Sequence, residues 1–340
     1  MNHAEEVFES VDSGRLNERR AERRVNRRNF LTGVGAVGAA AALAGCGSNS
    51  SSMTTTPTTT TYTDADILNF ALNLEYLEAE FYLRAATGSG LASADTGSSA
   101  GAVTGGTKVT GLTTTQQNIL NEIAYDEQEH VRFLRSALGS AAVARPAIDL
   151  TNSFNALASA AGIASAFNPF GSFDAFVVGA FIFEDVGVTA YAGAAPLIST
   201  GGITSGYLAA AAGIMAVEAY HAAYVRTYLT AQAIASSSYP YLGYANKVSA
   251  LRATLGGGFE TALTVPTGTP PFTSTIPTAS SIVAATSANA IAYARTTDQV
   301  LHIVYGSLSN TSGATTSASG VAKGAFFPNG LNGNITVTQS

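Results

Sequence analysis

The chain contains no tryptophan and a single cysteine, and charged residues make up only 12% of its 340 positions. One cysteine, Cys46, cannot form an internal disulfide, so a small disulfide-stapled fold is excluded. Glycine-rich stretches such as 256–258 do not connect a strand to a helix, as a phosphate-binding loop requires. The sequence is instead rich in Gly, Ala, Ser and Thr, a composition that suits closely packed helices joined by long polar loops.

Basic residues are scarce after the first 31 positions. Residues 1–31 hold seven arginines and six acidic residues, whereas the remainder holds ten basic and seventeen acidic residues. An acidic body without basic runs is not typical of proteins that bind nucleic acid. We therefore expect no nucleic-acid partner.

The first 46 residues contain two export motifs in order. Arg27-Arg28, followed by Asn-Phe-Leu, looks like a twin-arginine signal, and the Leu-Ala-Gly before Cys46 resembles a bacterial lipobox. The apolar run between them, residues 33–44, is too short for a membrane span, which needs about 20 residues. The alternative is a flexible, alanine-rich N-terminus that contains an arginine pair by chance.

These motifs predict the layout of the N-terminal region. We expect a twin-arginine and lipoprotein signal peptide over residues 1–45 and a Ser/Thr-rich tether over 46–63. Lipidation of Cys46 would anchor the exported protein to a membrane of the cell envelope. The twin-arginine route moves folded proteins, so a metal could be acquired in the cytoplasm before export.

Four long segments carry apolar residues at helical spacing, at about 64–86, 115–138, 172–193 and 205–235. Residues 87–114 are interpreted as a long loop. Residues 139–170, which include Pro146 and Pro169, form a crossover in which a short helix at 153–166 is an option. The order predicts an all-α four-helix bundle with a long crossover over 64–235. Residues 236–340 are expected to be a C-terminal extension with a fifth helix at about 286–306.

Each of the four segments places a glutamate within its apolar face: Glu75, Glu127, Glu184 and Glu218. Glu184 is the clearest case, because it directly follows the apolar run 176–183. A carboxylate in such surroundings costs several kcal/mol if it stays ionised and unpaired. These side chains therefore need a common positive partner.

Two of the segments also carry a histidine three residues after the glutamate, in Glu127-x-x-His130 and Glu218-x-x-His221. Residues at i and i+3 share a helix face with Cβ atoms about 5–6 Å apart, so both can reach one ion. Two such helices, with one glutamate from each of the other two, supply ligands for two adjacent ions. We predict six metal ligands: Glu75, Glu127, His130, Glu184, Glu218 and His221.

Each motif has a simpler interpretation when it is taken alone. A Glu-x-x-His pair is often a surface pair, and a lone glutamate at the edge of a core often reaches solvent. Glu80 has a sufficient partner in Arg84 at i+4. Glu78, one turn from Glu75, is ambiguous and could replace it as a ligand. His302 has no partner pattern and is interpreted as a packing or surface residue.

The first and third segments share a second pattern. Tyr82 follows Glu75 by seven positions, as Tyr191 follows Glu184, and each such segment precedes a Glu-x-x-His segment. A helix pair used twice indicates a bundle with pseudo-twofold symmetry. We expect both tyrosines to be core aromatics close to the metal site.

The residues from Leu72 to Tyr82 resemble the first helix of exported bacterial ferritin-like proteins, which are related to plant desiccation-related proteins. The stretch from Phe326 to Gly333 is similar to the same family, so the likeness covers nearly all of the chain after the leader. The resemblance to the wider ferritin-like superfamily implies an all-α bundle that binds two iron or two manganese ions. It also implies a reaction with dioxygen or peroxide.

The resemblance has a further implication for the residues around the metals. In several diiron enzymes, the acid just before one Glu-x-x-His pair bonds the ligand histidine of the other pair. This implies that Asp126 orients His221, and the alternative is that Asp126 faces solvent. Val217 occupies the mirror position and cannot accept a hydrogen bond, so His130 needs another acceptor, for which Asp185 is a candidate.

Two functions of different class follow. The first is an oxidoreductase that acts on peroxide or dioxygen in envelope stress defence. The second is a non-catalytic envelope stress or desiccation protein with weak or no metal binding. Cage-type iron storage is disfavoured, because the tether, the inserted loop and the extension would obstruct a shell. A homo-oligomer of another kind stays open.

Overall fold

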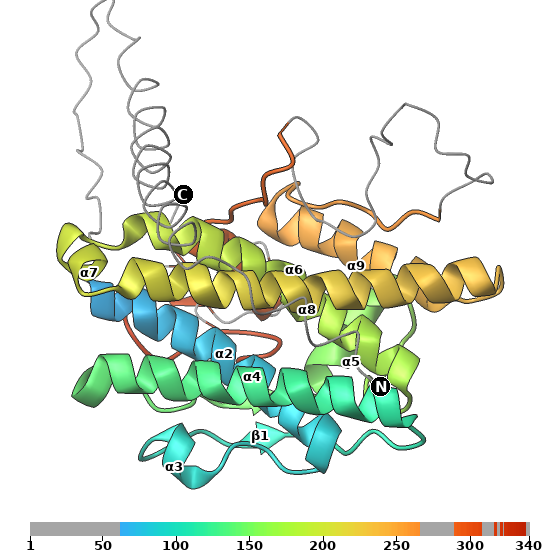
Figure 1. The fold of residues 1–340 in the computed structure, drawn as a ribbon, viewed down its shortest axis with the longest axis horizontal. Coiled ribbons are helices and arrows are strands. Elements are labelled where there is room, and N and C mark those ends of the chain that lie inside the picture. Colours follow the sequence, from blue (N-terminus) through green and yellow to red (C-terminus); the bar gives the residue numbers. More distant parts are fainter. Residues whose placement is uncertain (1–61, 266–288, 308–315, 318–319, 322, 338–340) are drawn as a thin grey trace, which may run out of the picture. The chain divides into compact units, whose positions relative to one another are not determined.

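Figure 1 shows the chain as a computed structural model, which describes residues 62–265, 289–307, 316–317, 320–321 and 323–337. The predicted signal peptide, Cys46 and nearly all of the predicted tether lie outside these residues. The structure therefore does not bear on the predicted export and lipidation.

Four long helices form the body of the described chain (Figure 1). They are α2 (Asp64–Thr87), α4 (Thr114–Leu138), α6 (Phe173–Ala194) and α8 (Tyr207–Ala235). Helix α2 packs chiefly against α4, and α6 packs chiefly against α8. The long segment between α4 and α6 crosses from one pair to the other. The predicted all-α four-helix bundle with a long crossover is confirmed.

Local side-chain chemistry sets the ends of these helices. Thr63 and Thr113 accept hydrogen bonds from the backbone N–H groups of Asp66 and Gln116, whose side chains bond back to the capping residues. Helices α2 and α4 therefore both begin with a capping box. Helix α2 ends at Gly88, whose φ of 88° lies in the left-handed region that glycine adopts readily.

The segments that join the bundle helices contain short elements. The inserted segment between α2 and α4 has a short helix, α3 (Ser93–Thr96), and a strand, β1 (Val103–Thr104). Strand β1 pairs in parallel with β2 (Ile148–Asp149) of the crossover, which ties the two segments together. The optional crossover helix is α5 (Asn152–Ala160), and it ends well before residue 166.

These segments bury the outer side of α2. Glu80 Oε2 lies 2.8 Å from Arg84 Nε, as predicted, and the other carboxylate oxygen contacts Arg145 of the crossover. The Asn73 amide donates to the Asn332 carbonyl oxygen at 2.7 Å, so the C-terminal extension covers the same side. Helix α2 is consequently buried along almost its whole length, although it carries several polar residues.

The C-terminal extension contains a helix that the sequence analysis missed. Helix α9 (Tyr241–Gly256) packs against α6 and α10 (Thr297–Tyr305). Its buried positions include Ala245, Val248 and Leu255, at helical spacing. The Pro-, Gly- and Thr-rich stretches after residue 235 favoured loops, whereas this segment forms a helix that packs against α6 and α10.

The predicted fifth helix at 286–306 was wrong at its start. Helix α10 begins at Thr297, and residues 289–296 are not helical. Thr296 caps the helix in a capping box with Gln299, which stops it in the N-terminal direction. The backbone N–H of Arg295 donates instead to the Thr189 carbonyl oxygen at 3.0 Å. Residues 286–288 lie outside the described part of the chain.

The remaining described elements are small. They are a short helix and two pairs of turns or strands, namely α7 (Thr200–Thr204), the 3-10 turns Gly139–Ala141 and Ala195–Leu197, and the antiparallel strands β3 (Thr316–Ser317) and β4 (Gly320–Val321). The six residues of the site described below lie on α2, α4, α6 and α8.

Two segments have the length and apolarity of membrane spans, Phe173–Leu197 and Tyr207–Ala235. The apolar window of the first is 94% buried inside the fold, as expected for the core helix of a bundle. The window of the second is 33% buried, and the buried side of α8 carries Glu218, His221 and Arg226. Composition alone is therefore weak support for a span in either segment.

Candidate metal centre

The bundle brings all six predicted ligand residues to one place between its four helices. The ligand atoms form two groups, each with three carboxylates and one imidazole. Within each group, all ligand atoms lie within 4.8 Å of one another. The groups are Glu75, Glu127, His130 and Glu218, and Glu127, Glu184, Glu218 and His221. All six residues are buried. We call these six residues the carboxylate cluster.

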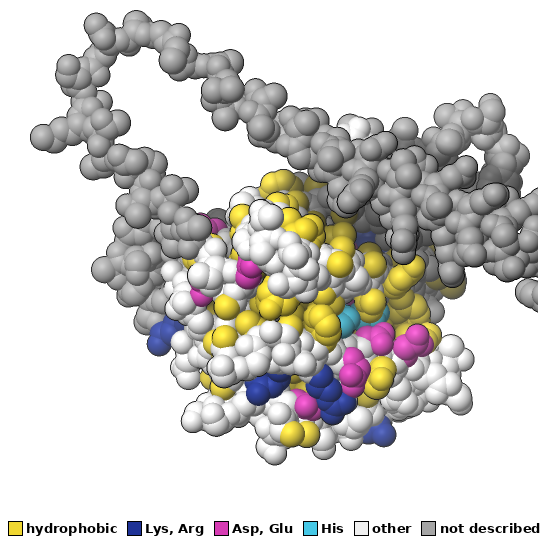
Figure 2. All heavy atoms as spheres, turned by 60° about the vertical axis from the view of Figure 1, so that its left-hand side comes forward, with side chains coloured by type: hydrophobic (Ala, Val, Ile, Leu, Met, Phe, Trp, Pro, Cys, Tyr) yellow, Lys and Arg dark blue, Asp and Glu magenta, His cyan; other side chains and the backbone are white. Residues whose placement is uncertain are grey.

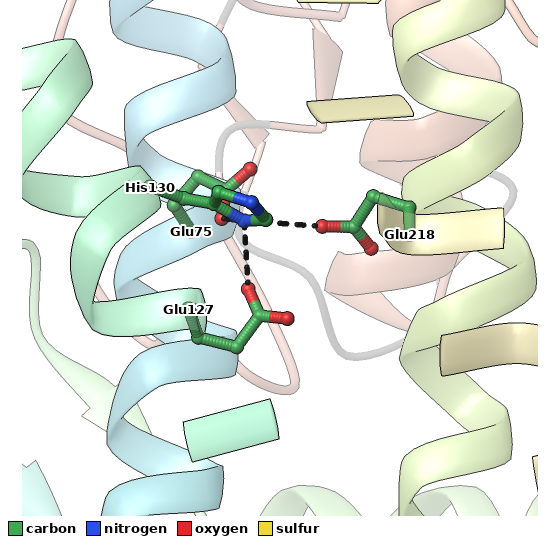
Figure 3. Close-up of side chains that lie close together, drawn as sticks. All are labelled: Glu75, Glu127, His130 and Glu218. Atoms are coloured by element: carbon green, nitrogen blue, oxygen red, sulfur yellow. Dashed lines mark hydrogen bonds and ion pairs between the residues drawn. The ribbon is translucent and has the colours of Figure 1, made fainter. Parts of the chain in front are cut away.

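The first group surrounds the Nδ1 atom of His130 (Figure 3). This atom lies 3.2 Å from Glu75 Oε2, 3.4 Å from Glu127 Oε2 and 3.6 Å from Glu218 Oε1. The side chains come from α2, α4 and α8, so the group forms only when these helices pack. Figure 3 shows Glu218 reaching across from α8 towards the imidazole ring.

The second group is arranged in the same way around His221. Its Nδ1 atom lies 2.9 Å from Glu127 Oε1 and 3.6 Å from Glu184 Oε2. Glu127 thus directs one oxygen to each histidine, and Glu127 and Glu218 belong to both groups. These two glutamates hold the shared positions between the groups, whereas Glu75 and Glu184 each belong to one group.

Two tyrosines form hydrogen bonds between α2 and α6 at the cluster. Tyr82 on α2 donates its hydroxyl hydrogen to Glu184 on α6, and Tyr191 on α6 donates to Glu75 on α2. Each tyrosine therefore bonds the glutamate that precedes the other tyrosine by seven positions. Both tyrosines therefore contact glutamates of the carboxylate cluster, and these hydrogen bonds fix the two outer carboxylates.

Asp126 contacts the histidine that the sequence analysis assigned to it. Asp126 Oδ2 lies 3.2 Å from Nε2 of His221, the ring nitrogen that faces away from the cluster. The expectation that Asp185 serves His130 was wrong, because Asp185 Oδ2 bonds Arg226 and Arg252 at 2.8 and 2.9 Å. Neighbouring residues on a helix point about 100° apart, which separates Asp185 from Glu184.

His130 lies closer to solvent than the rest of the cluster, with 11% of its side chain exposed. Figure 2 shows histidine atoms at the surface beside a group of acidic side chains. Asp126 is 31% exposed, and Glu122, one turn earlier on α4, is also exposed. The cluster therefore has a polar, acidic edge at the surface.

Glu78 is a further buried carboxylate next to the cluster, and the sequence left its role open. Its neighbours raise its pKa well above the ordinary value, first through burial and then through the charges of Glu127, Glu75 and Glu184. Gly187 on α6 leaves room for it, because an added Cβ would overlap Glu218 Oε2 and lie 3.4 Å from Glu78 Oε1. Glu78 therefore lies beside Glu218, outside both groups of ligand atoms.

Burial and mutual repulsion dominate the protonation of the other carboxylates. Burial raises the pKa of Glu184 to about 8, and burial followed by the charge of Glu78 raises the pKa of Glu218 well above its ordinary value. Glu127 behaves oppositely. Burial acts to raise its pKa, but interactions with the neighbouring His130 and His221 imidazoles outweigh this and lower it to about 2.

The histidines show the complementary shift. Burial lowers the pKa of both, but the surrounding carboxylates raise it to about 11 for His130 and to about 10 for His221. The carboxylates contributing most to these increases are Glu75 for His130 and Glu184 for His221. Without a metal, the raised pKa values favour the protonated form of both histidines and of Glu75, Glu184 and Glu218.

The residues present fit a pair of transition-metal ions. Several buried polar atoms form no hydrogen bond of good geometry among the described residues, namely both carboxylate oxygens of Glu127 and Glu218, Glu184 Oε2 and His221 Nδ1. Buried acceptors without a donor are costly, and a bound cation satisfies them. Carboxylate and imidazole together suit iron and manganese.

Two other residues considered in the sequence lie away from this centre. His302 Nδ1 lies 2.7 Å from the Ser307 carbonyl oxygen at the end of α10, which agrees with the predicted packing role. Glu80 faces the inserted segment and the crossover. Neither belongs to a group of ligand atoms.

Comparison with known proteins agrees with this geometry. Residues 63–231 match the family model described as a ferritin-like domain. The chain is 30% identical to "Ferritin-like catalase Nec2" of Nesocodon mauritianus over 80% of this chain and 84% of that protein. It is 32% identical to "Desiccation-related protein PCC13-62" of Craterostigma plantagineum over 57% of this chain and 63% of that protein.

The match extends beyond the four bundle helices, since the alignment with the first relative covers 282 residues. The fold, the paired Glu-x-x-His helices and these relatives lead to one conclusion: the chain belongs to the ferritin-like superfamily and is related to desiccation-related proteins.

Proposed function

We propose that the chain is an oxidoreductase that disproportionates hydrogen peroxide at a centre of two iron or two manganese ions. The observation that carries this proposal is the set of buried carboxylate oxygens and an imidazole nitrogen that form no hydrogen bond within the described chain and belong to two compact groups of ligand atoms. The relative named as a ferritin-like catalase supports the choice of peroxide as substrate.

The reaction converts two molecules of hydrogen peroxide into two of water and one of dioxygen, so one peroxide is oxidised and the other is reduced. The bound metals supply the change of oxidation state and the Lewis acidity. Six side chains of the chain would hold them: Glu75, Glu127, His130, Glu184, Glu218 and His221. Glu127 and Glu218 hold the shared positions, because they belong to both groups of ligand atoms.

The remaining polar residues would orient these ligands and hold protons. The Tyr82 and Tyr191 hydroxyl groups fix Glu184 and Glu75, and Asp126 fixes the ring of His221. The two protons that leave the oxidised peroxide are needed by the reduced one. Glu78 stands beside Glu218 with a raised pKa, so its carboxyl group can hold such a proton inside the bundle.

We also propose that the protein works at the cell envelope, exported by the twin-arginine route and anchored through lipidated Cys46. The support is the Arg27-Arg28 motif followed by an apolar run and Leu-Ala-Gly-Cys46. In the native host, Cys46→Ser should release the protein from the membrane fraction or block its processing. Replacing both arginines by lysine should reduce export. Normal retention and processing of Cys46→Ser would show that Cys46 is not an anchor.

Metal analysis and gas evolution test the reaction. Protein made without residues 1–45 in metal-replete cells should contain about two iron or manganese ions per chain. It should release one dioxygen for every two peroxide molecules consumed, and Glu218→Gln should lose both properties. Well-folded, unchelated protein with only trace metal would contradict the metal centre. Full metal content without dioxygen release would contradict the peroxide reaction alone.

The alternative is a non-catalytic stress protein. The relative named as a desiccation-related protein favours it, as do the Ser-, Thr- and Gly-rich connecting segments. In that case, removing metal should leave the protein's protective effect on a drying-sensitive test enzyme unchanged. Loss of that effect together with the metal would instead favour the redox centre.

A further inference from the structure

A hollow of about 520 Å³ opens at the surface between the inserted segment and the crossover. Residues 105–107 form one wall, and residues 166–170 form much of the other. The hollow has polar groups at its edge, such as the side chains of Thr151 and Asn155. The partly buried Phe167 belongs to its lining and also to that of a cavity deeper in the fold.

This deeper space, which we call the outer cavity, has a volume of about 20 Å³ and lies among α5, α6, α9 and α10. Eleven of its twelve lining residues are apolar, and the exception is Arg252. The Arg252 guanidinium is bound to Asp185 and Glu260 at 2.9 and 2.6 Å and lies over the Phe181 ring. Apolar cavities of this kind stay dry even when they are large enough for water.

A second space, the inner cavity, also has a volume of about 20 Å³ and is lined by α2, α6, α10 and Phe326. It shares the lining residues Ile182 and Ile303 with the outer cavity, so the two spaces lie next to each other. Its lining is apolar except for Glu78.

The inner cavity ends at the carboxylate cluster. Glu78 and Gly187 both line it, and a Cβ added to Gly187 would overlap the Glu218 carboxylate. Because glycine has no side chain, the cavity wall at this point is only as thick as the backbone of α6. The three spaces therefore follow one another from the surface to Glu218.

We infer that the surface hollow, the outer cavity and the inner cavity form an apolar passage for dioxygen between solvent and the carboxylate cluster. The inference rests on the proposed function, in which dioxygen is the product. Exchange between the spaces requires rotation of Phe167 and then of Ile182 or Ile303, and side chains in protein interiors do change rotamer. A small apolar molecule loses little by entering such a lining, whereas water and peroxide lose hydrogen bonds.

The polar edge of the cluster lies elsewhere. His130 and Asp126 are partly exposed there, next to Glu122, and these groups can exchange hydrogen bonds with a polar substrate. Peroxide would therefore use the acidic edge, while dioxygen would use the passage through Phe167 and Ile182. Separate routes prevent the product from obstructing the approach of the substrate.

Xenon tests the passage without any metal. Crystals of the protein pressurised with xenon should show xenon in both the outer and the inner cavity. Ala158 lines the outer cavity on α5, so Ala158→Phe should abolish xenon there. Ala156 lies on the same helix and is exposed, so Ala156→Phe should keep the xenon sites. Absence of xenon from both cavities of the unaltered protein would overturn the inference.

A rate measurement tests whether dioxygen reaches the carboxylate cluster through this passage. In chemically reduced, metal-loaded protein, the rate constant for reaction with dissolved dioxygen should fall roughly tenfold in Ala158→Phe and stay unchanged in Ala156→Phe. Ala158→Leu replaces Ala158→Phe if the larger side chain prevents folding. Phe167→Ala should leave xenon bound and keep or raise the rate.

The two measurements separate this inference from the proposed function. Xenon in both cavities of protein that binds no metal would contradict the proposed function and still support the passage. An unchanged dioxygen rate in a folded Ala158 variant that has lost its xenon would overturn the passage and leave the peroxide reaction intact.

Discussion

Glu184 and Asp185 are consecutive buried acids on α6, yet they belong to two different clusters. One cluster is rich in carboxylates, and the other pairs its carboxylates with arginines. Glu184 faces the carboxylate cluster, which contains four carboxylates and two imidazoles. Asp185 faces a second buried group, which we call the arginine cluster and which consists of Asp185, Arg226, Arg252, Glu260 and Arg295.

The ion pairs of the arginine cluster form without any ligand, although Arg252 Nε has no hydrogen-bond partner among the described residues. Arg252 joins Asp185 to Glu260, and Arg295 binds the other Glu260 oxygen at 2.6 Å. Backbone carbonyl groups of Phe181 and Phe259 accept further hydrogen bonds from these guanidinium groups. Since α8, α9 and residue 295 all contribute, this cluster attaches the C-terminal extension to the bundle.

The carboxylate cluster is only partly paired, because the two tyrosines bond Glu184 and Glu75. Both oxygens of Glu127 and of Glu218, the two glutamates shared by the groups of ligand atoms, form no hydrogen bond with the part of the chain that the structure describes. The comparison teaches that burial of charge alone does not identify a binding site. What distinguishes the candidate site is an excess of acceptors that the described chain leaves unsatisfied.

The largest expected effect is on the arginine cluster. Arg252→Met removes the group that joins Asp185 to Glu260, so it should lower the free energy of unfolding by about 3–5 kcal/mol with or without metal. Arg132→Ala, which breaks an exposed pair with Asp95, should cost about 1 kcal/mol or less. Urea denaturation measures both, and similar small losses would contradict the structural role of the arginine cluster.

The same kind of change should have the opposite consequence in the carboxylate cluster. Glu218→Gln keeps the shape, and burial and the neighbouring carboxylates already favour the neutral form of Glu218, so metal-free stability should change by no more than about 1 kcal/mol. Unaltered protein should gain about 2.7 kcal/mol from metal at a hundred times its dissociation constant, and the variant should gain little. Thermal denaturation with and without manganese measures this, and an equal gain in both proteins would exclude Glu218 as a ligand.

The third prediction concerns Asp126, which lies at the edge of the metal centre and contacts the ligand His221. Asp126→Ala removes the acceptor at Nε2 of His221 and should weaken metal binding about 10–100-fold. Asp126→Asn keeps an acceptor oxygen and should retain most of the affinity, while Glu122→Ala, an exposed acid on the same helix, should change nothing.

A second readout concerns protonation. Asp126 helps to raise the pKa of His221 to about 10, so this pKa should fall in metal-free Asp126→Ala. Nuclear magnetic resonance titration of the histidine measures it. An unchanged His221 pKa with unchanged metal affinity would show that Asp126 has no role.

The smallest effect is a pH dependence that only the carboxylate cluster should show. Burial raises the pKa of Glu184 in the folded protein to about 8. The protonated carboxyl group therefore contributes stability that is complete below about pH 4.5 and is lost as the pH rises through about 8. His130 and His221, with raised pKa values, act in the same direction at higher pH. Metal binding requires the deprotonated groups, so it gains strength over the same range.

The melting temperature of metal-loaded protein minus that of metal-free protein should therefore increase between about pH 5 and about pH 8. We expect a change of about 2–4 °C, which corresponds to about 1 kcal/mol in a domain of this size. A constant or falling difference would show that protons and metal do not compete at this cluster.

Much of the candidate site was predictable because it depends on local spacing. The i, i+3 pairs Glu127–His130 and Glu218–His221 and the Glu-to-Tyr spacing of seven are properties of single helices. The Asp126 contact could also be proposed, because it follows from which residue neighbours Glu127. Glu78 stayed ambiguous, because one helix cannot show that Gly187 on another leaves space beside Glu218.

The errors have the opposite origin. Helix α9 was missed because its short apolar pattern becomes decisive only against α6, and α10 begins late because Arg295 binds Thr189 and the arginine cluster. Asp185 was assigned to His130 because the sequence does not reveal Arg226 and Arg252 on the far side of α6.

The sequence by itself determined the four bundle helices, their order and the residue types that face their apolar interior. Helical periodicity and capping act over a few residues, so a linear pattern contains them. Only the tertiary structure decided which acid faces which partner, which glutamate each tyrosine bonds, and where the apolar cavities meet Glu218. Those features depend on side chains that are far apart in the sequence, such as Tyr82 and Glu184 at a separation of 102 positions, which only packing brings together.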